Sequence, residues 1–102
     1  MSADTIGEIT RILDDMLAKI PTERNYNAEF GRVAEILLRE HSVAIPALDL
    51  RLKFTLLMQD EFSAIPREEW KVSDMEWLAR MEQVTKQKFL QWIEEQIKEK
   101  GD

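Results

Sequence analysis

Apolar residues recur in this chain at the three- and four-residue spacing that places side chains on one face of a helix. Residues 5–19 carry one such stripe, and residues 27–41 carry a second. The pattern of residues 73–100 predicts a third helix, roughly 40 Å long at the rise of an α-helix. The main apolar residues of the first two stripes are Ile6, Ile9, Leu13, Met16, Leu17 and Ile20, followed by Phe30, Val33, Ala34, Leu37 and Leu38.

Residues 47–58, ALDLRLKFTLLM, depart from this spacing because apolar and polar residues alternate. Strict alternation is typical of a half-buried β-strand. The composition favours a helix, since Thr55 is the only β-branched residue between 46 and 62 and no second segment offers a strand to pair with. We therefore predict a helix over residues 46–62 that is apolar nearly all round and lies at the centre of a bundle. A strand that pairs across a dimer is the alternative.

Three Ile-Pro pairs, at residues 20–21, 45–46 and 65–66, divide the chain into four blocks. Proline disfavours helix at the residue before it and suits the first helical turn after it. Together with the periodicity, these breaks predict an all-α fold. We expect a single helical domain over residues 1–102, built as a four-helix bundle with a short turn at 66–70 and a long C-terminal helix.

Several residues fit the chemistry of helix ends. A Ser or Thr followed three residues later by Glu forms a capping box, Asn is a good N-cap, and Gly often ends a helix. The residues expected in these roles are Thr5 with Glu8, Asn27, Ser73 with Glu76, and Gly101. Gly31 lies inside the second helix, where it costs about 1 kcal/mol relative to Ala, so we expect close packing there.

Charge and composition narrow the classes of partner. The chain has 14 Lys and Arg against 20 Asp and Glu, a net charge of −6, and it has no cysteine. Net acidity argues against nucleic acid, because phosphate binding needs clustered cations. The N-terminal MSADTIGEIT lacks the basic and apolar segments of a secretory signal, and no segment approaches the ~18 apolar residues of a membrane span. We expect a cytoplasmic protein with no nucleic-acid or membrane partner.

The chain offers few residues for catalysis. His41 is the only histidine, so neither a two-histidine metal site nor a relay between two histidines can form, and we expect His41 at a helix end or on the surface. The three glycines are too far apart for a phosphate-binding loop. Acidic residues four positions apart occur only near the chain ends. We therefore expect no enzymatic activity and no cofactor or metal.

Aromatic residues give the strongest functional signal. The apolar arc of residues 73–100 spans roughly two-thirds of the helix circumference, more than three shorter helices are expected to cover. Trp, Met and Phe are enriched at protein interfaces. We expect a protein that binds itself, as a homodimer, or another protein in the manner of an inhibitor, adaptor or chaperone. The side chains expected to form the interface are Trp70, Trp77, Met81, Phe89 and Trp92.

Two other functions stay open. The abundance of acidic residues is compatible with a metal-dependent hydrolase of nucleotides or small molecules, built from carboxylates of several helices. The net negative charge is compatible with imitation of nucleic acid, although the interspersed lysines and arginines make the surface a poor copy of a phosphate backbone. Neither alternative is supported by a motif.

Overall fold

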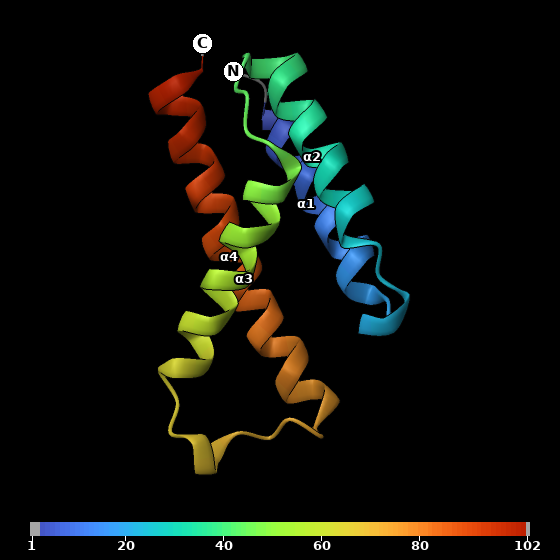
Figure 1. Ribbon diagram of the computed structural model, residues 1–102, viewed down its shortest axis with the longest axis vertical. Helices are drawn as coiled ribbons and strands as arrows, with labels where there is room; N and C mark the ends of the chain where they lie inside the picture. Colours follow the sequence, from blue (N-terminus) through green and yellow to red (C-terminus); the bar gives the residue numbers. More distant parts are fainter. Residues whose placement is uncertain (1–2, 102) are drawn as a thin grey trace.

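The computed structural model describes residues 3–101, and within them the chain is folded entirely into helices and short connections (Figure 1). The prediction of an all-α four-helix bundle is confirmed. The segment 47–58 is helical, so the alternative of a strand is wrong. The elements are α1 (Ala3–Ala18), the 3-10 turn η1 (Pro21–Glu23), α2 (Tyr26–His41), α3 (Ala47–Ser63), the 3-10 turn η2 (Arg67–Glu69) and α4 (Met75–Lys100).

The four helices form a ring in which each packs against the next in chain order and α1 closes against α4. Figure 1 shows α1 and α2 running antiparallel, while α3 and α4 cross and diverge toward the connection that contains η2. The molecule measures 45 × 26 × 23 Å, and its radius of gyration of 14.2 Å exceeds the roughly 13 Å of a compact domain of this length. The extra length comes from the two crossing helices, which extend beyond α1 and α2.

Three phenylalanines from three helices meet at the centre of the core. Phe30 of α2, Phe54 of α3 and Phe89 of α4 have ring centroids between 5.5 and 5.7 Å apart, in tilted or edge-to-face geometry. These are the arrangements that aromatic rings prefer. The aliphatic residues around them that expose no surface are Ile9, Leu13, Met16, Val33, Leu37, Leu50 and Ile93.

Helix α3 explains how an alternating pattern can be helical. Residues two positions apart lie roughly 200° apart around a helix, so alternating apolar residues divide between two opposite sides. Leu50 and Phe54 lie on the core side, whereas Leu48, Leu52 and Leu56 lie on the exposed side. The expectation that neighbouring helices surround α3 is therefore wrong, because they cover only one side.

The helix boundaries fall within two residues of the predicted ones, but two of the caps differ. Asn25, and not Asn27, caps α2, and Asp74, and not Ser73, caps α4. In each case an Asn or Asp side chain accepts a hydrogen bond from backbone N–H groups two or three residues further on. The sequence offers two adjacent or nearly adjacent capping residues at both sites, and local pattern does not distinguish them.

The predicted cap at Thr5 is also wrong, since Thr5 lies inside α1 and is buried. Its Oγ1 lies 3.1 Å from Nε2 of His41, which lies at the C-terminal end of α2, one of its two expected positions, and is buried there. Gly101 does end α4, as predicted, and its N–H donates to the carbonyl of Ile97. A Cβ at this position would lie 2.9 Å from the carbonyl oxygen of His41, so the close approach of α4 to α2 requires glycine.

Arg24 lies between η1 and α2, at the opposite end of α2 from His41. There it joins the connection after α1 to α4. Its side chain is only 4 % exposed and donates to both carboxylate oxygens of Glu82 on α4, to Tyr26 Oη, and to the carbonyls of Leu17 and Lys19 at the end of α1. Burial, the largest single effect, lowers the pKa of Arg24, but the hydrogen bonds to Glu82 and Tyr26 and the charge of Glu82 outweigh it and raise the pKa. Arg24 therefore stays protonated and caps α1.

A leucine-to-alanine substitution should lower the free energy of unfolding by very different amounts on the two sides of α3. Leu50→Ala should lower the free energy of unfolding by about 2–5 kcal/mol, because it opens a cavity beside the phenylalanines. Leu52→Ala, two residues along the same helix, should change it by no more than about 0.5 kcal/mol at dilute concentration, because the side chain is exposed. Urea unfolding followed by circular dichroism measures both, and equal losses would contradict the assignment of the two sides.

Candidate functional site

The five side chains that the sequence predicts as a protein interface lie mostly inside the fold. Phe89 belongs to the central phenylalanine cluster and exposes no surface, and Trp77 and Met81 are buried. Trp70 and Trp92 are half-buried. The interface assignment of this set stays a prediction, but only the two half-buried tryptophans present much surface to a partner.

The aromatic residues near the N-terminal end of α4 hold the connection between α3 and α4 in place. Trp70 Nε1 donates to the carbonyl oxygens of Ile65 and Phe62, at 3.0 and 3.2 Å. The Phe62 ring lies edge-on to the rings of both Trp70 and Trp77. Of the apolar residues of α4, Trp77 is covered by these contacts, whereas Met75 and Val84 are exposed.

Exposed apolar surface gathers instead on the outward side of α3. Leu48, Leu52 and Leu56 follow one another at four-residue spacing and are 71, 55 and 47 % exposed. Single exposed leucines are common on folded proteins, whereas a contiguous row of them marks an interaction site. We call these three residues the outer leucine face; they span roughly 12 Å along the helix.

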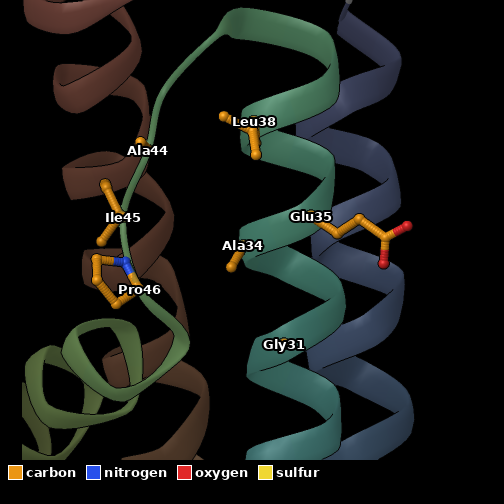
Figure 2. A pocket seen from close by; sticks show the side chains of 7 residues that line it. All are labelled: Gly31, Ala34, Glu35, Leu38, Ala44, Ile45 and Pro46. Carbon is orange, nitrogen blue, oxygen red and sulfur yellow. The ribbon is translucent and has the colours of Figure 1, made fainter.

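An open hollow of about 480 Å³ lies between α2 and the connection that leads into α3 (Figure 2). Ala34 and Leu38 point from α2 toward this connection, while the carboxylate of Glu35 points away from it. A Cβ on Gly31 would meet nothing within 4 Å, so the expected close packing at Gly31 does not occur within the chain. The residues that line the hollow are Gly31, Ala34, Glu35, Leu38, Ala44, Ile45 and Pro46.

A second hollow, of about 280 Å³, lies on the α4 side of the outer leucine face. Leu52 and Leu56 form part of its wall, and Trp92 of α4 lines it as well. The Lys53 ammonium lies 5.5 Å from the centroid of the Trp92 ring, within the range of a cation–π contact. Ile45, in the connection before α3, lines both hollows, so the two hollows adjoin at this residue.

Charged groups border this surface. Asp49 and Lys53, one helical turn apart, lie on the flank of α3 that faces the second hollow. On the other flank, Arg51 is engaged within the chain, since it donates to Asn27 Oδ1 at 2.8 Å and lies 5.4 Å from the centroid of the Tyr26 ring. An apolar centre with a charged rim is the usual anatomy of a protein–protein interface.

The described part of the chain shows no arrangement suited to metal chemistry. Within residues 3–101, no group of three or more His, Asp or Glu side chains is placed to hold a metal ion. The buried His41 has Thr5 as its polar neighbour. No helix of the described residues is long and apolar enough to cross a bilayer.

Comparisons of the chain with protein-family models, with curated proteins and with solved structures find no significant match. Relatives therefore supply no function for the outer leucine face, and its own chemistry is the guide to what it binds.

Sequence reasoning assigned the exposed apolar surface to α4 and missed it on α3. The signal was present in ALDLRLKFTLLM, because its alternating apolar residues separate into two sets of four-residue spacing. Leu50 and Phe54 form one set, and the outer leucine face forms the other. The pattern does not indicate that neighbouring helices cover only one of the two sets, because this depends on the tertiary arrangement.

Because Gly31 faces open space, its replacement by alanine should stabilise the protein. Gly31→Ala should raise the free energy of unfolding by about 0.5–1 kcal/mol, because alanine stabilises a helix interior and its Cβ meets no atom. Gly101→Ala is the matched control and should destabilise the protein, since its Cβ would collide with the His41 carbonyl. Thermal unfolding of both variants measures the difference, and a loss of stability in Gly31→Ala would show that the hollow is closed in solution.

Proposed function

We propose that this protein acts by binding another polypeptide through the outer leucine face and its two adjoining hollows, without catalysis of its own. The observation that carries the proposal is the row of Leu48, Leu52 and Leu56, about half or more exposed on a helix whose opposite side already fills the core. A folded chain gains nothing from these side chains while water covers them.

Covering this face with a partner releases free energy that favours binding. Full burial of a leucine contributes about 1.5–3 kcal/mol, so covering three leucines that are about half exposed yields about 1 kcal/mol or more for each. Trp92, which borders the face, is the kind of side chain that concentrates binding energy at interfaces. Of the five residues predicted from the sequence, Trp92 is the one that this surface includes.

The hollow beside α2 supports the proposal because it suits an inserted side chain. Its walls are small or aliphatic, and the charged group of its one acidic residue, Glu35, points elsewhere. The missing side chain at Gly31 lets a partner approach the backbone of α2 closely. A bulky apolar anchor inserted between two elements is typical of the energetic centre of an interface.

The alternative of a carboxylate-based hydrolase has no observation in its favour. Acidic side chains do not gather at either hollow of the face: each is lined by a single carboxylate residue, Glu35 in one and Asp49 in the other. A metal site in a helical bundle needs several carboxylates that project toward one point. Association with a polypeptide is therefore the function that the geometry supports best.

Site-specific photo-crosslinking tests the proposal in the cells that normally make the protein. With benzoylphenylalanine in place of Leu52, irradiation should yield a discrete covalent adduct with a polypeptide. Val84, an exposed apolar residue of α4, is the matched control position and should yield none. Added purified wild-type protein should compete the adduct away, whereas the Leu52→Glu variant should not. Equal adducts from both positions, or none from either, would contradict the proposal.

A further inference from the structure

We infer that the polypeptide on the outer leucine face is a second copy of this chain, with the two α3 helices antiparallel about a twofold axis at Leu52. The inference rests on the proposed function and names its partner. A twofold interface uses the same patch on both subunits, so the patch must be complementary to itself. Three features meet this condition: the row of exposed leucines on α3, the charges on its flank and the extent of the exposed surface.

The apolar row is symmetric about Leu52. Leu48 and Leu56 lie one turn before and one turn after it, and all three lie on the exposed side of α3. In an antiparallel pair, Leu52 meets Leu52 of the second copy, and Leu48 meets Leu56 of the second copy. The row runs along an i, i+4 ridge, and packing of two such ridges is a common mode of helix contact.

The charges on the flank of α3 are complementary when the direction is reversed. Asp49 and Lys53 carry opposite charges one turn apart, next to the second hollow. With the helices antiparallel, this flank meets its own copy, and each Asp49 comes within a turn of Lys53 of the second copy. Asp49 and Lys53 cancel, and Lys100 of α4, which also lines the second hollow, adds a positive charge that favours the approach of two chains with a net charge of −6 each.

A parallel pair uses these charges less well. It would set the flank of Asp49 against the opposite flank, where Arg51 is the only cation next to the row. Arg51 is already hydrogen-bonded to Asn27 and lies over the Tyr26 ring, so it would have to leave both contacts to meet Asp49. The antiparallel pair leaves those contacts in place.

The face extends over several helices, as a dimer interface requires. A specific interface covers roughly 800 Å² on each partner, which is about an eighth of the 6531 Å² surface of this chain. The outer leucine face and its adjoining hollows reach from Gly31 on α2 to Trp92 on α4, across three of the four helices. A twofold axis at Leu52 places this whole surface against its copy.

Light scattering after size-exclusion chromatography tests the dimer directly. The wild-type chain should have a mass of about 24 kDa, twice its 12.0 kDa, and dissociate only on strong dilution. Because each substitution enters the interface twice, Leu52→Glu should weaken the dimer by at least about a hundredfold while its circular dichroism stays unchanged. An equimolar mixture of Leu52→Glu and Leu52→Lys should restore the dimer, since the two side chains meet at the axis.

Disulfide formation between introduced cysteines tests whether the two α3 helices run antiparallel. Because the chain has no native cysteine, only the introduced ones can form a crosslink. A mixture of Leu48→Cys and Leu56→Cys should form crosslinked dimers on mild oxidation, whereas Leu48→Cys alone should not. Val84→Cys is the control on another exposed surface and should stay monomeric. Crosslinking of Leu48→Cys with itself would overturn the antiparallel arrangement.

These experiments distinguish failure of the dimer from failure of polypeptide binding at the outer leucine face. A monomer at every concentration, or a dimer unaffected by Leu52→Glu, would overturn the inference. If the Leu52 photo-adduct then has a mass other than twice that of the chain, the face binds a different polypeptide and the proposed function stands. If no adduct forms either, both proposals fail.

Discussion

The contact of Phe54 with Phe30 and Phe89 decides the arrangement of this protein. It joins the three helices α2, α3 and α4 at one point and fixes which side of α3 faces inward. Leu50, one turn earlier on the same side, extends that contact. Once these two residues occupy the core, the helix geometry directs Leu48, Leu52 and Leu56 away from it.

The other elements of the described chain cover one side of this helix and leave Leu48, Leu52 and Leu56 exposed on the other. The other three helices complete a ring around one core, with Arg24 and Glu82 joining the connection after α1 to α4. Contacts among Phe62, Trp70 and Trp77 hold the connection between α3 and α4 in place. Within residues 3–101, no element covers the outer leucine face, and we propose that a second polypeptide does.

The sequence predicts this architecture well where short-range physics decides it. Helical periodicity and the three Ile-Pro breaks place the helices within two residues of their positions in the structure. They do not distinguish Asn25 from Asn27 as a cap, because both suit that role. The burial of His41 and the exposure of Leu52 depend on which elements lie alongside, and no local pattern contains that information. The burial of Trp77 and Phe89 depends on the tertiary arrangement in the same way, since a buried and an interfacial aromatic residue look alike in sequence.

A second copy of the chain, we propose, covers the outer leucine face. Nuclear Overhauser effects between isotope-labelled and unlabelled chains, measured in a mixed sample, detect such a contact. We expect intermolecular contacts between the methyl groups of Leu48 and Leu56 and between those of the two Leu52 residues. Intermolecular contacts that involve other surfaces only, or none at concentrations where the chain is fully folded, would contradict it.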